Sequence, residues 1–389
     1  MTAAVKTIRE ISVGVYDGPH ATPELHDEGA AVFLGIPNLL PDGRIDVTAA
    51  RWVAERDLAK WTRRVTPQPN DIVFTYEATL NRYAIIPEGF RCCLGRRTAL
   101  IRPDPSQIDH RFLFYYFFSP RWRAQIEANT LTGATVDRIP LTTFPEFEVL
   151  VPELEEQKRI AEVLSAYDDL IATNQRRIAL LEDAARRLYR EWFVHLRFPG
   201  HESGPVKDGV PAGWQVKSLG EVAPLNYGKA LKANDRKDGK VPVYGSSGIV
   251  GTHNQALVEG GSIVVGRKGN VGSLFFSPVP CFPIDTVFYI APAQASYRIF
   301  LALHQLNFIS SDAAVPGLNR TYAHSLPVLQ PSEDVAATFE RLVQPVFEQS
   351  QHLTEQNAQL ARTRDLLLPK LMSGQLDVSG IRLPDEVAA

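Results

Sequence analysis

Two short segments of the sequence approach motifs that perform chemistry, and each departs from its motif at the residues that matter. Residues 261–268 read Gly-Ser-Ile-Val-Val-Gly-Arg-Lys, which approaches a phosphate-binding loop. That loop requires Gly-Lys followed by Ser or Thr, because the lysine reaches the phosphates and the hydroxyl binds Mg²⁺. Here Arg267, Lys268 and Gly269 stand in those places, and the apolar middle favours a strand. We therefore do not expect a nucleotide site.

The segment Tyr-Gly-Ser-Ser-Gly at 244–248 approaches a nucleophile elbow but is one residue short of Gly-x-Ser-x-Gly. A surface turn is the better interpretation, since no acid and histidine follow at convincing positions. The sequence contains no His-Glu-x-x-His, Gly-x-Gly-x-x-Gly or Cys-x-x-Cys, and Cys92, Cys93 and Cys281 lack metal-ligand spacing. We predict no catalytic residue and no metal site. A hydrolase that uses Ser246 or Ser247 is an alternative that a serine-reactive probe would test.

Polar, basic loops that contain glycine are what remains. They cluster in two parts of the chain, residues 1–152 and residues 199–330. Arg and Lys can contact phosphate or guanine, Asn and Ser can contact base edges, and glycine permits close approach of the backbone. Each loop alone is typical of a solvated turn, but the set favours a protein with two binding regions.

The elements that must position these loops include two long helices. From Ile160 to Trp192, mainly apolar residues recur at alternating steps of four and three, with Asn174 as the polar exception. The same ladder recurs 179 residues later, from Phe339 to Leu371. This heptad pattern predicts two helices of about 40 residues, or roughly 60 Å each.

Two features inside the ladders carry further expectations. Pro345 predicts a kink or a restart of the second helix, because proline lacks the N–H that continues the helix. Asn174 and Asn357 are polar residues in the apolar seam, and we hypothesise that they pin the register of the two helices. Partly hydrated positions near a splayed region are the alternative.

The flanks of the helices repeat as well. Residues 5–11 resemble residues 216–222 at an offset of 211, and Val-Asp-Arg at 136–138 matches Leu-Asn-Arg at 318–320 at an offset of 182. The chain is therefore a tandem duplication in which a globular segment and a long helix occur twice. The predicted segments are 1–152, 153–198, 199–330 and 331–389.

Composition and charge bound the class of protein. The chain has 389 residues, of which 44% are hydrophobic and 22% charged, as in ordinary globular proteins. Its longest apolar run, 112–118, is far too short to cross a bilayer, and we expect no signal peptide, because no basic segment followed by an apolar one precedes the first predicted elements. We expect a cytoplasmic protein without a membrane partner. The net charge is −3, but residues 200–330 hold 11 Lys and Arg against 8 Asp and Glu, a weak indication of a polyanionic partner.

Several motifs resemble one known family over essentially the whole chain. They are Pro-Glu-Leu-Glu-Glu-Gln-Lys-Arg-Ile-Ala at 152–161, Tyr-Gly-Ser-Ser-Gly at 244–248, Gly-Arg-Lys-Gly at 266–269, Val-Pro-Gly-Leu-Asn-Arg at 315–320 and Leu-Leu-Pro-Lys-Leu-Met-Ser-Gly at 367–374. In this order, and with the duplication, they resemble the specificity subunit of type I restriction-modification systems.

The resemblance implies an α+β fold in which two target recognition domains alternate with two long helices that pack as an antiparallel coiled coil. Each domain would read one half of a split DNA target. Two methyltransferase subunits would dock on the helices, and restriction subunits with translocase and nuclease activity would join them. Adenine would be methylated at N6, with S-adenosylmethionine, ATP and Mg²⁺ held by the partners and no cofactor on this chain. A coiled-coil adaptor without catalysis or DNA recognition is the alternative.

The same resemblance turns the loops and helices into candidate contact sites. The candidate DNA contacts in the first segment are His20, Thr22, Arg82, Arg96, Arg97, Thr132, Thr135 and Arg138. Those in the third segment are Lys229, Tyr244, Ser246, Ser247, Arg267, Lys268, Asn270, Asn319 and Arg320. The candidate contacts with the methyltransferase subunits are Gln157, Ile160, Leu164, Leu188, Trp192, Phe193, Leu367 and Leu371.

Overall fold

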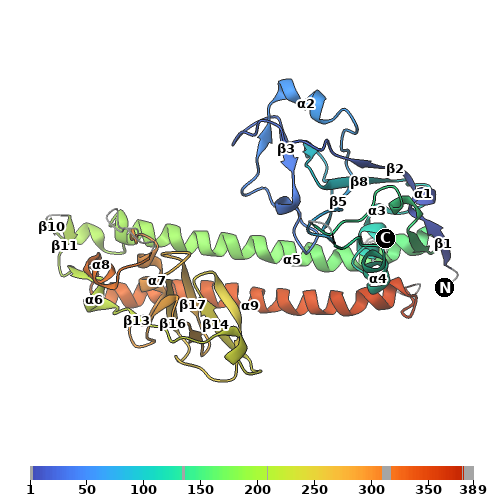
Figure 1. Cartoon of the computed structure of the whole chain (residues 1–389). Helices are drawn as coiled ribbons and strands as arrows, with labels where there is room; N and C mark the ends of the chain where they lie inside the picture. Colours follow the sequence, from blue (N-terminus) through green and yellow to red (C-terminus); the bar gives the residue numbers. More distant parts are fainter. Residues whose placement is uncertain (1–2, 134–135, 208, 309–316, 379, 381–389) are drawn as a thin grey trace. The chain divides into compact units, whose positions relative to one another are not determined.

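The structure is a computed structural model that describes residues 3–133, 136–207, 209–308, 317–378 and 380 (Figure 1). Its contacts divide the chain into two compact units, Met1–Thr173 with Gln356–Ala389, and Asn174–Glu355. Each unit thus combines one globular part with one half of each long helix. The four segments proposed along the sequence stay a prediction, because the units are defined by contacts rather than by position in the chain.

The first globular part contains short strands and helices and leads into the first long helix. Its elements are β1 (Ala4–Thr7), α1 (Ile8–Ile11), β2 (Ser12–Asp17), β3 (Ala31–Leu34), η1 (Ile36–Asn38), β4 (Trp52–Val53), α2 (Glu55–Trp61), β5 (Ile72–Thr75), β6 (Tyr83–Ile85), β7 (Cys92–Leu94), β8 (Thr98–Pro103), α3 (His110–Tyr116), α4 (Pro120–Ala128), η2 (Phe144–Glu146), β9 (Glu148–Val151) and α5 (Leu154–Tyr189).

The second globular part begins directly after the first long helix and leads into the second long helix. Its elements are η3 (Arg190–Val194), η4 (His201–Ser203), β10 (Val206–Lys207), β11 (Val210–Pro211), β12 (Gln215–Ser218), α6 (Leu219–Val222), β13 (Asn226–Tyr227), η5 (Ala233–Asp235), β14 (Val241–Gly245), β15 (Gly248–His253), β16 (Ser262–Gly266), β17 (Leu274–Ser277), β18 (Phe282–Pro283), β19 (Val287–Ile290), α7 (Tyr297–Leu303), α8 (Arg320–Ser325), β20 (Pro327–Gln330) and α9 (Glu333–Met372).

The sheet topology confirms the tandem duplication. The four-stranded sheet has the order β2-β8-β5-β6 in the first unit and β13-β19-β16-β17 in the second. The three-stranded sheets β4-β3-β7 and β15-β14-β18 each contain one parallel pair, β3 with β7 and β14 with β18. The two-stranded sheets β1-β9 and β12-β20 are both antiparallel. Each strand of these sheets therefore has an equivalent in the other unit.

The resemblance between residues 5–11 and 216–222 is a repeated helix start. Thr7 and Ser218 each form a capping box, in which the hydroxyl and the backbone N–H donate to the carboxylate three residues on, Glu10 or Glu221. These hydrogen bonds lower the pKa of both carboxyls. Because the motif is local, it can be read directly from Ser/Thr-x-x-Glu in each copy.

The two heptad ladders face each other. In the first unit Ile160, Leu164 and Leu371 are buried, and in the second unit Trp192 and Phe339 lie with ring centroids 5.4 Å apart. The Asn357 side-chain amide donates to the carbonyl of Ile171 at 3.4 Å. The ladders confirm the antiparallel coiled coil, whereas the pinning of its register by Asn174 and Asn357 stays a prediction.

The second long helix does not restart at Pro345. Helix α9 runs from Glu333 to Met372 without interruption, so the expected restart was wrong, whereas a kink at Pro345 stays a prediction. Pro345 and Arg341, one turn earlier, are exposed. Water can therefore hydrogen-bond the Arg341 carbonyl, which has no N–H partner at the proline.

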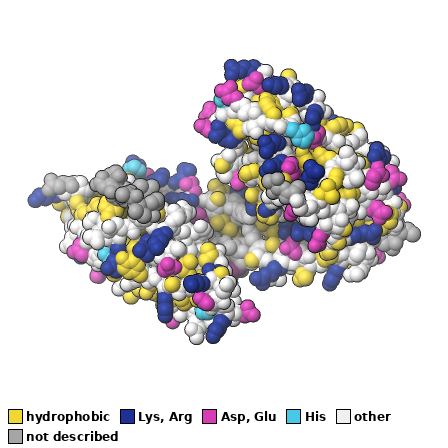
Figure 2. Space-filling view, viewed as in Figure 1, with side chains coloured by type: hydrophobic (Ala, Val, Ile, Leu, Met, Phe, Trp, Pro, Cys, Tyr) yellow, Lys and Arg dark blue, Asp and Glu magenta, His cyan; other side chains and the backbone are white. Residues whose placement is uncertain are grey.

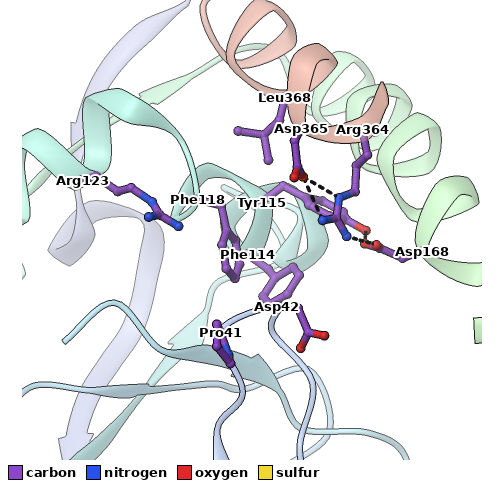
Figure 3. A pocket seen from close by; sticks show the side chains of 10 residues that line it. All are labelled: Pro41, Asp42, Phe114, Tyr115, Phe118, Arg123, Asp168, Arg364, Asp365 and Leu368. Carbon is purple, nitrogen blue, oxygen red and sulfur yellow. Dashed lines mark hydrogen bonds and ion pairs between the residues drawn. The ribbon is translucent and has the colours of Figure 1, made fainter. Parts of the chain in front are cut away.

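Arg364 occupies a position of the ladder where an apolar residue would be usual, and it forms a polar network in the first unit (Figure 3). Its guanidinium pairs with Asp168 of α5 and with Asp365, and the Tyr115 hydroxyl of α3 donates to Asp168 at 2.6 Å. Burial and the Asp168 carboxylate raise the pKa of Tyr115 well above its ordinary range, so the hydroxyl keeps its proton. The network joins α3, α5 and α9 beside a cavity of about 310 Å³.

Replacing Arg364 by Met is expected to lower the free energy of unfolding of the full chain by about 1–3 kcal/mol, because Asp168 then loses its charged partner. Urea unfolding followed by circular dichroism measures the change. Arg362→Met is the matched control on the exposed side of the same helix, and it should shift stability by less than about 0.5 kcal/mol. Equal effects of the two substitutions would show that the network adds no stability.

Candidate nucleic-acid interface

Four loops of the second unit meet at one end of its four-stranded sheet. In the antiparallel register Tyr227 lies opposite Phe288 and Gly266 lies opposite Val287. The chain therefore leaves β13 and β16, and enters β19, at the same end of the sheet. We call this set of residues, 227–229, 267–273, 284–286 and 317–320, the second rim.

Backbone hydrogen bonds hold the second rim together. The N–H groups of Arg267 and Lys268 both donate to the Thr286 carbonyl at 3.0 Å, and Leu318 N–H donates to the Arg267 carbonyl at 2.8 Å. Lys229 N–H donates to the Pro283 carbonyl at 3.0 Å. Segments that lie almost a hundred residues apart in the sequence thus present their side chains from one edge.

A tyrosine that the sequence analysis did not select lies at the centre of the second rim. The guanidinium carbons of Arg267 and Arg320 lie 5.0 and 4.8 Å from the centroid of the Tyr227 ring, which is within cation–π range. Tyr227 packs on Phe288 and remains 50% exposed. The sequence analysis selected Lys229 from this loop, but only the sheet register places the Tyr227 ring beside two arginines.

The equivalent end of the sheet in the first unit gathers a comparable set of loops. Asp17 lies opposite Ala99, and Thr75 lies opposite Thr98, so the loops that begin or end at these strands share one edge. We call residues 17–20, 76–82, 95–97 and 136–138 the first rim. Ala78 N–H donates to the Asp137 carbonyl at 2.8 Å, which joins the segments 76–82 and 136–138 of the rim.

The first rim brings together His20, Arg82, Arg96, Arg97 and Arg138. In both units the repeated motif lies against the loop that follows the equivalent strand: 136–138 against the β5–β6 loop, and 318–320 against the β16–β17 loop. The same topology thus places arginines at the same edge twice. Figure 2 shows Lys and Arg side chains on the visible face of each unit.

The backbone of the first rim is strained. Ala78, Asn81 and Arg97 have φ angles of 69°, 60° and 80°, a left-handed conformation that residues other than glycine rarely adopt. Such residues cost about 1–3 kcal/mol each and persist where the surrounding structure holds them. Nη1 of Arg82 and Nε of Arg97 are also buried without a hydrogen-bond acceptor among the described residues.

In the first rim a carboxylate pairs with one of the four arginines, Arg97, and a second carboxylate contacts His20 and Arg64, which lies outside the rim. Asp17 contacts Arg64 at 2.5 Å and His20 Nε2 at 2.9 Å, and Glu77 lies 3.7 Å from Nε of Arg97. In the second rim, no described Lys or Arg has such an ion pair. The two rims therefore share a topology but differ in electrostatic balance.

One predicted DNA contact is corrected by its burial, and another has a local structural role. The Tyr244 ring is buried against Phe275, and burial raises its pKa, so this side chain belongs to the core and not to the surface. The Asn319 side chain accepts from Tyr322 N–H at 3.2 Å and caps α8, directly before Arg320. Asn319 thus helps to place Arg320.

The other predicted DNA contacts lie on the surface or near it. Ser246 and Ser247 form the turn between β14 and β15, and the Ser246 carbonyl accepts from the Ser273 hydroxyl at 2.6 Å, beside the second rim. Thr22 and Thr132 are exposed outside the first rim, and Lys268 and Asn270 are exposed within the second. Thr135 lies outside the described residues. Contact of any of these residues with DNA stays a prediction.

Most of the predicted methyltransferase contacts are buried in this chain's own core. These residues are Gln157, Ile160, Leu164, Trp192, Phe193 and Leu371, and only Leu188 and Leu367 of the set are half-buried. The prediction of side-chain contact was wrong for the buried six, because a heptad ladder identifies a buried seam without telling what it packs against. Here the two ladders of one chain bury each other.

Exposed leucines lie on the same long helices outside the seam. In α5 they are Leu170 and Leu180, and in α9 they are Leu342 and Leu366. Leu180 is 61% and Leu366 is 68% exposed. Sequence periodicity did not single out these residues, because they fall outside the ladder.

The described part of the chain has no helix both long and apolar enough to cross a membrane. Within the same residues, no three His, Cys, Asp or Glu side chains are grouped as ligands for a metal ion. The three cysteines are buried, and burial raises the pKa of the Cys92 and Cys93 thiols to about 12. These two thiols are therefore protonated at neutral pH and are poor nucleophiles.

Comparison with known proteins gives one consistent family. The chain is 25% identical over 361 residues to the type I restriction enzyme MjaIX specificity subunit of Methanocaldococcus jannaschii, which covers 84% of this chain and 82% of that protein. It is 20% identical over 366 residues to the HindI specificity subunit of Haemophilus influenzae, with 71% and 80% covered. Its fold matches the crystal structure of a type I restriction-modification S subunit from M. genitalium with a TM-score of 0.59, at 19% identity and 95% and 96% coverage.

The family model for the type I restriction modification DNA specificity domain matches residues 41–183 and 211–325, which together exceed half of the chain. The two matched stretches include most of both rims and the first part of α5. They confirm the resemblance, and with it the prediction that the chain confers specificity and is not itself an enzyme. The chain belongs to the type I restriction-modification DNA specificity family.

Proposed function

We propose that this specificity subunit reads a bipartite DNA target, with one half-site contacted by each rim. The observation that carries the proposal is the repetition of the rim. Two equivalent sheets gather arginines at the same edge, from loops that correspond in the two copies. A protein that only scaffolds others has no use for two such edges, which argues against the adaptor alternative.

The chemistry of the second rim suits double-stranded DNA. A guanidinium stacked on an aromatic ring keeps N–H donors at its edge, and a bidentate contact of that edge with O6 and N7 identifies guanine. The guanidinium carbons of Arg320 and Arg267 lie over the Tyr227 ring, within cation–π range. Lys229 and Lys268 are exposed beside them and suit phosphate oxygens. Base reading and backbone contact can thus come from one edge.

The long helices would set the length of the spacer between the half-sites. Helices α5 and α9 contain 36 and 40 residues, which at 1.5 Å per residue correspond to about 54 and 60 Å. A pair of helices joined along a buried seam bends little, so it suits the role of a spacer.

Two methyltransferase subunits would dock on the exposed sides of α5 and α9, where leucines outside the seam offer apolar contacts. Restriction subunits would complete the complex. S-adenosylmethionine for N6-adenine methylation, and ATP with Mg²⁺ for restriction, would be held by those partners in the cytoplasm. The named relatives are specificity subunits of restriction enzymes, which supports this assignment of roles.

Deleting the gene is expected to remove one bipartite N6-methyladenine motif from the genome of the source strain. Single-molecule sequencing of the strain with and without the gene measures this directly and also identifies the target sequence. Restoring the gene on a plasmid should restore the motif. An unchanged map, combined with continued capture of the methyltransferase subunit by this chain, would favour the adaptor.

Arg320→Ala is expected to cost about 1–3 kcal/mol of discrimination at one base pair of a single half-site, because the guanidinium fork is lost. Methylation of duplexes that carry each substitution in the target measures the loss. Lys217→Ala, on an exposed face of the same unit away from the rim, should leave all half-sites unchanged. If the Arg320→Ala variant discriminates against every substituted duplex as well as the unmodified protein does, Arg320 does not read a base.

Leu366→Asn is expected to weaken capture of the methyltransferase subunit about tenfold or more, because an exposed leucine at a docking surface would bury its side chain on binding. Co-purification and surface plasmon resonance measure the affinity. Val279→Asn, an exposed apolar residue away from the long helices, is the matched control. Equal capture by both variants would move the docking surface elsewhere.

A further inference from the structure

The two globular parts differ in how far their basic side chains form ion pairs. In the first, arginines at many positions pair with a carboxylate. They are Arg9, Arg44, Arg51, Arg56, Arg64, Arg91, Arg97, Arg102, Arg111 and Arg121. Among the described residues of 200–330, no Lys or Arg forms an ion pair. This difference exceeds what the charge counts alone indicate, 17 basic against 18 acidic residues in 1–152 and 11 against 8 in 200–330.

The contrast extends to the rims. In the first rim Glu77 lies beside Arg97, and Asp17 contacts His20 and the neighbouring Arg64, which lies outside the rim. In the second rim Arg267 and Arg320 are held by the Tyr227 ring and by the backbone carbonyl of Asp285, without a carboxylate. Among the described residues, the basic side chains of the second rim therefore form no ion pair.

Paired and unpaired cations differ in how they bind a polyanion such as DNA. An unpaired cation that meets a phosphate releases a counterion from DNA, so binding is favourable on any sequence and depends steeply on salt. A cation that is already paired must first give up its carboxylate. Such a cation binds DNA favourably only where the DNA group that it contacts interacts with it at least as strongly as the carboxylate did. On a wrong sequence the carboxylate loses its partner and nothing replaces that interaction.

We infer that the second unit supplies most of the sequence-independent affinity for DNA, whereas the first unit supplies discrimination by exchanging internal ion pairs for DNA contacts. This inference rests on the proposed function, since it divides the task of DNA reading between the two rims. Glu77 and Asp17 are then specificity-determining residues that act through Arg97, Arg64 and His20.

The backbone of the first rim supports the exchange. Arg97 has a left-handed φ of 80°, and its Nε is buried without a hydrogen-bond acceptor among the described residues. Nη1 of Arg82 is in the same condition. A strained loop with unused donors has a raised free energy in the unbound state, so a rearrangement that satisfies those donors on the correct half-site is favoured.

Two charge-matched double variants test the division of labour in the full chain co-purified with its methyltransferase subunits. The probe is a fluorescein-labelled duplex of arbitrary sequence, and its Kd is measured by anisotropy over a series of NaCl concentrations. Lys229→Gln with Lys268→Gln should reduce the slope of log Kd against log salt by about 1.8, or 0.9 for each phosphate contact. Arg64→Gln with Arg97→Gln should change the slope by less than half as much.

A single substitution tests the role of the acid with an opposite sign. Glu77→Gln frees Arg97, so it should tighten binding to the arbitrary duplex about two- to fivefold. The ratio of the affinity for the target sequence, as identified by the methylation map, to the affinity for the arbitrary duplex should fall by a similar factor. Glu259→Gln removes one exposed carboxylate from the second unit away from its rim, and it should not reduce that ratio. Thermal unfolding of every variant checks that the fold is retained.

The outcomes separate the two levels of the argument. Equal slopes for the two double variants, or weaker binding by Glu77→Gln, overturn the division between the rims and leave the proposed function standing. If the unmodified complex binds neither the arbitrary duplex nor the target sequence, the proposed function fails as well.

Discussion

Mutual burial of the two heptad ladders is the interaction on which the rest of the molecule depends. Each ladder alone would expose an apolar stripe along a helix of 36 or 40 residues, which the other ladder covers together with the cores of the globular parts. The strands that precede the helices tie the globular parts to this seam. Strand β9 ends three residues before α5 begins, and β20 ends three residues before α9 begins. A shift of one helix along the seam would therefore move β9 or β20, the strands that join the globular parts to the long helices.

The first unit shows how a polar residue can be accommodated in such a seam. Arg364 interrupts the apolar ladder, but the carboxylates of Asp168 and Asp365 balance its charge within the same unit, and the Tyr115 hydroxyl donates to Asp168. In return the guanidinium connects α9 to α5 and, through Asp168, to α3. This position of the seam is less apolar than its neighbours. It favours one register of α5 against α9, because the charged partners must lie within contact distance.

Duplication explains why the two rims are alike, and divergence explains why they differ. Equivalent strand order puts the loop after β5 and the loop after β16 at the same edge, whatever their residues are. The side chains on those loops are free to change without altering the sheet. In one copy Glu77 and Asp17 balance the basic groups, and in the other Tyr227 supports two arginines without balancing them. One scaffold thus carries two surfaces of different electrostatic character.

Local patterns in the sequence determined the two long helices and the capping boxes at Thr7 and Ser218, because each depends on residues within one or two turns of each other. The duplication was visible because the same local patterns occur twice in the chain. Tertiary structure alone decided what the ladders cover, so Ile160 and Leu164 became core residues rather than docking residues. It also decided that Tyr244 is buried while Tyr227 is exposed beside two arginines, although both directly precede a glycine. The reason is that burial at a strand end depends on the register with distant strands, such as Tyr227 opposite Phe288, and no spacing within one segment encodes that register.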